Sequence, residues 1–193
     1  MTMITYHFAY NEEKRVVGVD YDPEKKTGYT CIGCGAPLVP VRGKVREHHF
    51  RHKSDADGCV SYESFLHKLG KRMLMERFEE SESFVVGVEK CNSCDKKEAC
   101  KMAKELCKSS TFVDPIDMKK IYTRCEEEKE YKGFRADVLL DSDDRERRPP
   151  LFLEIAVSHK CEPKKIESKI KIIEFDVQNE FEAFALKTCP IVW

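Results

Sequence analysis

The feature that most constrains the fold of this chain is a group of cysteines and histidines near the N-terminus. Cys31 and Cys34 are separated by two residues, and His49 and His52 follow with the same spacing. Two thiolates and two imidazoles are a common ligand set for zinc, and the glycines beside the cysteines permit the tight turn that brings two thiolates together. We therefore predict a zinc site formed by Cys31, Cys34, His49 and His52.

Two alternatives are open within this site. His48 is separated from His52 by three residues and is an alternative ligand to His49, and Cys59 can substitute for one of the four. Four protein ligands make a closed site, which is structural and not catalytic. We predict a zinc-binding β element over residues 1–58, and because so small a unit has little core of its own, we expect loss of the ion to unfold residues 20–58 locally.

Composition narrows the class of protein. The 193 residues include 10 Cys and carry a formal net charge of −1. The N-terminus shows no secretory pattern, and no stretch approaches the roughly 20 apolar residues of a membrane span. We therefore expect a cytoplasmic protein without a membrane partner, whose cysteines bind metal in preference to forming disulfides. A uniformly basic nucleic-acid binder is excluded, although residues 41–53 form a basic segment that either faces phosphate or is solvated surface.

A second cysteine cluster is a further candidate metal site. Its members are Cys91, Cys94, Cys100 and Cys107. If residues 97–108 form one helix, the last two cysteines lie about 10 Å apart along its axis, whereas sulfurs on one zinc ion lie within about 4 Å of each other. Either the helix breaks or another cysteine, such as Cys125, supplies a ligand. Zinc and an iron–sulfur cluster both suit four thiolates.

The remainder of the chain predicts a mixed α+β or α/β domain over residues 59–193, with the cysteine-rich segment at about 91–107 as an insert. Apolar periodicity and capping residues indicate the following elements. Helices are predicted at 61–79 and 163–171, and strands at 84–88, 120–125, 134–140, 151–157 and 172–177. From residue 61 onward the order is thus helix, strands, helix, strand.

Two carboxylates lie inside apolar strands. Asp137 is in Phe134–Leu140 and Glu154 is in Leu151–Val157. A carboxylate in such a strand is costly to desolvate unless it is paired or bound to a cation. If the two strands form an antiparallel hairpin, the carboxylates meet on one face and can bind Mg²⁺ or Mn²⁺. The alternative is that each carboxylate pairs with a nearby Lys or Arg, or faces solvent.

The combination of these motifs resembles the competence protein CoiA-like family. The resemblance covers roughly residues 5–177 and is weak over 91–125. It is carried by the following residues: Cys31-Ile32-Gly33-Cys34, Pro37-Leu38, Gly43, Arg46, His49-Phe50-Arg51-His52, Glu63-Ser64, His67, Phe134-Arg135-Ala136-Asp137-Val138, Leu153-Glu154-Ile155-Ala156-Val157-Ser158-His159, Lys165-Ile166 and Ile173-Glu174-Phe175-Asp176.

The resemblance implies a small zinc-finger-like unit followed by a restriction-endonuclease-like domain of the PD-(D/E)XK type. Asp137 and Glu154 would then be the carboxylates of a catalytic Mg²⁺ or Mn²⁺ site, with the Ile155 carbonyl as a third ligand, and Glu63 would join them from the first helix. His67 and Lys71 are further candidates on that helix. The chain departs from the general nuclease pattern at Ala156, where Lys or Gln is expected, and Lys165 is our candidate replacement.

The sequence therefore predicts a metal-dependent nuclease that hydrolyses phosphodiesters in DNA during uptake, recombination or defence. In this hypothesis the cation activates water and Lys165 stabilises charge on the phosphate. Ala156 leaves a second hypothesis open, a catalytically inactive zinc-containing adaptor that binds DNA. A third is a zinc-stapled module that binds only protein.

Overall fold

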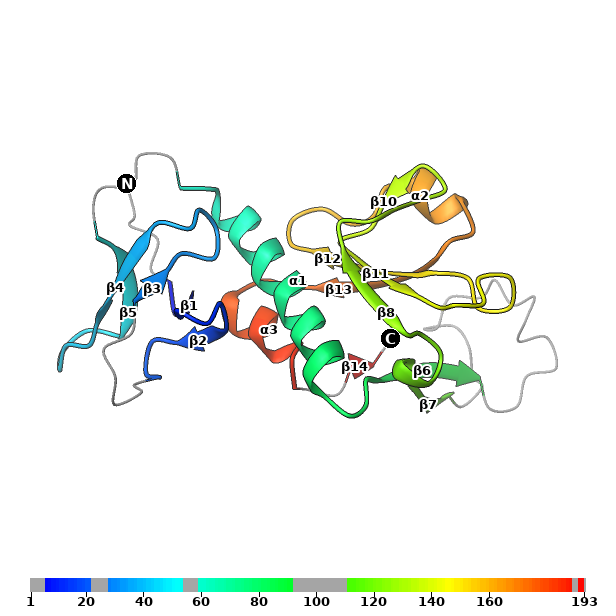
Figure 1. Cartoon of the computed structure of the whole chain (residues 1–193), viewed down its shortest axis with the longest axis horizontal. Coiled ribbons are helices and arrows are strands. Elements are labelled where there is room, and N and C mark those ends of the chain that lie inside the picture. The colour runs from blue at the N-terminus through cyan, green and yellow to red at the C-terminus, as the bar shows by residue number, and fades with distance from the viewer. Residues whose placement is uncertain (1–5, 22–27, 54–58, 92–110, 189–190, 193) are drawn as a thin grey trace.

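One long helix separates two sheets in the computed structural model, which describes residues 6–21, 28–53, 59–91, 111–188 and 191–192. The N-terminal sheet has the order β2-β1-β3-β4-β5, and neighbouring strands are antiparallel. Its strands are β1 Phe8–Tyr10, β2 Val16–Gly18, β3 Tyr29–Thr30, β4 Pro37–Val41 and β5 His49–His52. This sheet lies at one end of the molecule, beside the start of the helix (Figure 1).

The long helix, α1, spans Tyr62–Glu80 and confirms the helix predicted at 61–79. It begins at Ser61, whose side chain accepts a hydrogen bond from Ser64 N at 3.1 Å and so satisfies an amide that the helix leaves unpaired. It ends at Ser81, which is extended. Six large apolar residues of α1 are buried: Phe65, Leu66, Leu69, Met73, Leu74 and Phe78.

A four-stranded sheet packs on α1 and has the order β13-β12-β11-β8. β11 is antiparallel to both β8 and β12, whereas β12 and β13 are parallel. The crossover between β12 and β13 contains the short helix α2 (Figure 1). The elements are β8 Arg124–Glu127, β11 Val138–Asp141, β12 Leu151–Ala156, α2 Pro163–Glu167 and β13 Lys171–Asp176.

The two faces of this sheet pack against different parts of the protein. Ile155 of β12 faces α1, where a Cβ built on Gly70 would lie 3.1 Å from its Cδ1. Phe152 of the same strand belongs instead to a small cluster on the opposite face, with Leu139 of β11 and Ile170 after α2. Because side chains alternate along a strand, Glu154 shares the face of Phe152.

The remaining elements are short or lie at the far end of α1. They are β6 Val85–Cys91, β7 Thr111–Asp117, the 3₁₀ turn Met118–Lys120, β9 Glu130–Tyr131, β10 Phe134–Arg135, α3 Glu180–Ala185 and β14 Ile191–Val192. β6 pairs with β7 and β14 in a separate sheet, and β9 pairs with β10. Within the described ranges, no helix has both the length and the apolar character that crossing a membrane requires.

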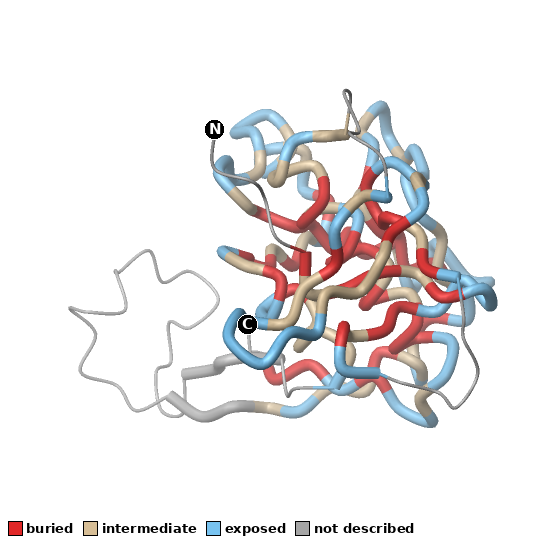
Figure 2. The backbone as a smooth tube through the Cα atoms, turned by 90° about the vertical axis from the view of Figure 1, so that its left-hand side faces the viewer, coloured by how far each residue is buried: buried red, intermediate tan, exposed pale blue. Residues whose placement is uncertain are grey.

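One hydrophobic core joins the N-terminal sheet to the rest of the described chain. It includes Tyr6 beside β1, Phe50 in β5, Phe65 in α1 and Leu153 in β12. Figure 2 shows these buried stretches inside an exposed outer surface. The domain boundary expected at residue 58 stays a prediction.

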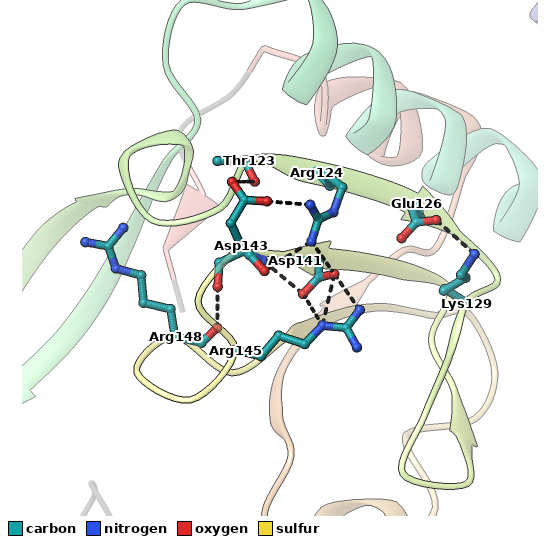
Figure 3. Close-up of polar contacts among 9 residues, drawn as sticks. Thr123, Arg124, Glu126, Lys129, Asp141, Asp143, Arg145 and Arg148 are labelled. Carbon is teal, nitrogen blue, oxygen red and sulfur yellow. Dashed lines mark hydrogen bonds and ion pairs between the residues drawn. The ribbon is translucent and has the colours of Figure 1, made fainter.

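A buried carboxylate fixes the loop that joins β11 to β12. Asp141 at the end of β11 is 1% exposed and accepts hydrogen bonds from Arg124 at 3.0 Å and from Arg145 at 2.6 Å (Figure 3). The Ser142 hydroxyl donates to Arg148 O at 2.7 Å in the same loop. These contacts anchor the 142–150 loop to the end of β11 and support the register between β11 and β12.

Candidate functional site

The first candidate site is a cluster of three cysteines and one histidine. Ligand atoms of Cys31, Cys34, His52 and Cys59 all lie within 4.8 Å of one another. Cys34 Sγ is 3.4 Å from His52 Nε2, and Cys31 Sγ is 3.9 Å from Cys59 Sγ. Thiolates with an imidazole are the donors that zinc prefers, so this cluster can hold a metal ion such as zinc.

Local structure explains how these four residues meet. Cys31 follows β3 and starts a tight turn, in which Gly35 N donates to Cys31 O at 2.8 Å and Gly35 has a φ of +76° that glycine adopts without strain. His52 is the last residue of β5, and Cys59 comes shortly before α1. The cluster therefore joins the N-terminal sheet to the start of α1.

His49 lies outside the cluster, which corrects the predicted ligand set. Its Nδ1 is 2.9 Å from Glu47 O, and its place in the cluster is taken by Cys59, the substitute ligand predicted from the sequence. The physical reason is that His49 and His52 lie three apart on strand β5, and alternation points such residues to opposite faces. The alternative ligand His48 is also elsewhere, with its Nδ1 2.5 Å from Asp20 Oδ1.

The cluster is packed against α1. The Lys68 ammonium of α1 donates to Gly33 O at 2.5 Å, and Tyr6 Oη is 3.4 Å from Cys59 Sγ. Burial raises the pKa of the Cys31 thiol to about 12. A bound cation would therefore be needed to stabilise the thiolate of Cys31 at neutral pH.

The second predicted cysteine cluster falls largely outside the described residues. Cys94, Cys100 and Cys107 are not among them, and Cys91 is described only as the last residue of β6. Cys125, the alternative fifth cysteine, lies in β8, where burial raises the pKa of its thiol to about 12.

The second candidate site is a pocket of about 370 Å³ beside β12 and α2. It is lined by polar and charged residues from α1, the β9–β10 hairpin, β12, β13 and the segment leading into α2. Those that can titrate are His67, Arg135, Asp137, Glu154, His159, Lys160, Cys161, Glu162, Lys165 and Glu174. Three of the four predicted catalytic residues, Asp137, Glu154 and Lys165, are thus brought to one pocket.

Asp137 is held in place by both α1 and β12. Its Oδ2 accepts a hydrogen bond from Ile155 N at 2.8 Å and lies 3.6 Å from His67 Nδ1. Burial by itself would raise the pKa of Asp137, but hydrogen bonding from His67 and Ile155 outweighs burial and the pKa lies below its usual value. Asp137 is therefore ionised at neutral pH and fixed at the pocket wall.

For Glu154, the effect of burial on the pKa outweighs the effect of its neighbours. It is 8% exposed, and burial raises its pKa although the adjacent Lys165 acts to lower it. Lys165 Nζ is 2.8 Å from Glu154 Oε1 in an ion pair, and Oε1 makes no further hydrogen bond among the described residues. A carboxylate this deeply buried is costly to desolvate, and an adjacent cation, here the Lys165 ammonium, offsets that cost.

The other predicted residues lie near the pocket without joining it as ligands. Glu63, in the first turn of α1, accepts a hydrogen bond from the Ser158 hydroxyl. Lys71 is buried and paired with Glu127 and Glu128 at 3.1 and 2.5 Å. In the part of the chain that the structure describes, only the Cys/His cluster brings three potential ligand atoms within 4.8 Å of one another.

Sequence reasoning did not assign Glu174 to the site. Glu174 lies in β13, lines the pocket and accepts a hydrogen bond from Cys161 N at 2.5 Å. The sequence pattern that identified Glu154, a carboxylate among apolar residues of a strand, is also present at Glu174 in Lys171–Asp176 and could have identified it. Comparison with known proteins adds no further residue, since no family model, no curated protein and no solved structure matches this chain.

Proposed function

We propose that this protein is a divalent-metal-dependent nuclease that hydrolyses phosphodiester bonds of DNA, as its resemblance to the competence protein CoiA-like family implies. The observation that carries the proposal is that Asp137 and the buried Glu154 line one pocket, where Glu154 Oε1 lies 2.8 Å from the Lys165 ammonium and makes no further hydrogen bond among the described residues. Two such carboxylates fit a hard cation such as Mg²⁺ or Mn²⁺, whose preferred ligands are oxygens.

The topology supports this proposal. The order α1, three antiparallel strands β8, β11 and β12, then α2 and the parallel strand β13 agrees with the helix–strands–helix–strand core that the resemblance implies. Asp137 directly precedes β11 and Glu154 lies within β12. These two features, the order of elements and the positions of the carboxylates, support the proposal of a PD-(D/E)XK-type core.

The residues of the pocket have separate roles in the proposed reaction. Asp137 and Glu154 would hold the cation, which when bound supplies an activated water and stabilises charge on the phosphate. Lys165 reaches the pocket from α2, where its ammonium also donates to Arg135 O at 2.7 Å. Ala156 offers no such group, so Lys165 is the cation that would stabilise the scissile phosphate.

The cysteine–histidine cluster has a structural role in this proposal. Its four protein ligands form a closed set that leaves no position for substrate. It holds the N-terminal sheet against α1, the helix that carries Glu63 and His67.

The test is DNA cleavage by zinc-loaded protein in Mg²⁺ and in Mn²⁺, comparing wild type with Asp137→Asn and Glu154→Gln. We expect wild type to cleave and each variant to lose activity by about 100-fold or more, because even residues that only orient metal ligands cost 10–100-fold. The control is Glu167→Gln, which removes an exposed carboxylate of α2 and should cleave like wild type.

Absence of cleavage by wild-type protein on single- and double-stranded DNA would contradict the proposal. Ala156 favours one specific alternative in that event, a DNA-binding adaptor without catalysis. The adaptor predicts salt-sensitive DNA binding that Asp137→Asn and Glu154→Gln leave intact. Equal cleavage by wild type and both variants would place the activity elsewhere and would also overturn the proposed site.

A further inference from the structure

Three carboxylates lie in or beside three neighbouring strands. Val138 of β11 is opposite Leu153 of β12, so Asp137, which directly precedes β11, lies one step beyond the end of this antiparallel register, on the side of Glu154. In the parallel pair of β12 and β13, Glu154 is the direct partner of Glu174. The sheet thus places Asp137, Glu154 and Glu174 side by side.

Glu154 and Glu174 are on the same face of the sheet. Phe152 and Ile172, two residues before each of them, pack in one cluster on the face away from α1, and residues two apart on a strand share a face. Asp137 directly precedes β11 and contacts His67 of α1, so it reaches the pocket from the end of that strand. The three carboxylates also line the same pocket.

The spacing of strands divides this line into two pairs. Neighbouring strands are about 4.8 Å apart, so the backbones carrying Asp137 and Glu174 are separated by about 10 Å. Oxygen ligands of one Mg²⁺ or Mn²⁺ lie within about 4 Å of one another. In the described residues these three carboxylates are not brought within 4.8 Å as a group. As they lie, the three side chains therefore do not converge on one ion, which leaves each adjacent pair as a separate place for a cation.

The charges at Glu174 also point to a cation. Lys165 pairs with Glu154 and is anchored by Arg135 O, and within the described ranges no lysine or arginine pairs with Glu174. Glu174 Oε1 accepts a hydrogen bond from Cys161 N, and the neighbouring Glu154 Oε1 is contacted by the Lys165 ammonium at 2.8 Å. Because the ammonium of Lys165 pairs with Glu154 and not with Glu174, the two adjacent carboxylates retain a negative charge that a divalent cation would neutralise.

We propose that Glu154 and Glu174 form a second divalent-cation subsite at the junction of β12 and β13. This inference rests on the proposed function, because the second subsite lies beside the Asp137–Glu154 subsite proposed there. Glu154 contributes a ligand to both subsites. The ligands are carboxylate oxygens, so the subsite takes a hard cation of the Mg²⁺, Mn²⁺ or Ca²⁺ class.

The test counts bound Mn²⁺ in the full-length, zinc-loaded protein by electron paramagnetic resonance and by calorimetric titration. We expect wild type to bind two Mn²⁺ per chain, and Glu174→Gln and Asp137→Asn to bind one each. Glu154→Gln should weaken both sites. Glu162→Gln is the matched control, because it removes a carboxylate that lines the same pocket outside the strand registers, and it should still bind two. Thermal unfolding of each variant verifies that it is folded.

The subsite is overturned if wild type binds fewer than two Mn²⁺, or if Glu174→Gln binds as many as wild type. DNA cleavage by the same samples separates this result from the proposed function. Two bound Mn²⁺ without cleavage would reject the nuclease and retain the subsite. Cleavage with a single bound Mn²⁺ that Glu174→Gln does not affect would retain the nuclease and reject the subsite.

Discussion

Replacing Cys59 by serine tests the ligand set that the structure assigns to the metal cluster. Cys59 Sγ lies 3.9 Å from Cys31 Sγ, whereas His49 lies outside the group and contacts Glu47 O. Serine preserves the size of the side chain, but its hydroxyl is a poor ligand for zinc compared with a thiolate. The substitution therefore removes one of four ligands with little change in packing.

The size of the effect follows from the ligand count. Structural zinc binds with an apparent free energy of about 10–16 kcal/mol, so an equal share for each of four ligands is about 3 kcal/mol. We expect Cys59→Ser to weaken zinc binding by about 100-fold, since each 1.4 kcal/mol corresponds to tenfold. At this chain length the same free energy lowers the unfolding temperature by roughly 6–12 °C.

The assay is competition for zinc with a chromophoric chelator, together with thermal unfolding in excess zinc. His49→Ala is the matched control, and its zinc affinity should remain within about threefold of wild type, because His49 is not a ligand. The opposite pattern, with zinc affinity lost in His49→Ala and kept in Cys59→Ser, would refute the ligand set and the strand-alternation argument behind it.

Two further predictions concern packing and pH. A Cβ at Gly33 would lie 2.5 Å from Val60 Cγ2, so Gly33→Ala should lower the free energy of unfolding by about 1–3 kcal/mol in urea titration, whereas Gly43→Ala, with nothing within 4 Å, should be near neutral. Burial raises the pKa of Glu180 from 4.5 to about 7. The folded state therefore binds more protons between these values, and stability should fall by about 3 kcal/mol as pH rises from 4.5 to 7. Urea titrations across this range should show that Glu180→Gln lacks this decrease; an equal pH slope in the variant would contradict the assignment.

Long and strongly patterned elements could be predicted from the sequence. The capping serine and the apolar face placed α1 within one residue at each end. The predicted antiparallel hairpin forms between β11 and β12, although the strand predicted at 134–140 is interrupted and Asp137 lies between β10 and β11. Such features are encoded locally, by alternation, by periodicity and by caps.

Other features depend on contacts that local sequence does not encode. Preferring Cys59 to His49 as the fourth ligand required the knowledge that His49–His52 forms a strand. The sequence does not show this, because these four residues have no clear alternation of polar and apolar side chains. Glu174 joins the pocket only through the parallel register of β12 with β13. Strands of two residues, such as β9 and β10, are too short to show any periodicity.

The position of α1 between the two candidate sites affects how chelation experiments must be interpreted. Lys68 of α1 holds the Cys31–Cys34 turn, and His67, the preceding residue, contacts Asp137 in the carboxylate pocket. If the cluster holds zinc, removing it would release the start of the helix and thereby disturb the carboxylate pocket as well. Under the proposed function, loss of DNA cleavage in a strong chelator such as EDTA would therefore report the loss of either zinc or Mg²⁺. Restoring zinc alone, and then Mg²⁺ alone, would assign the loss of cleavage to one of the two ions.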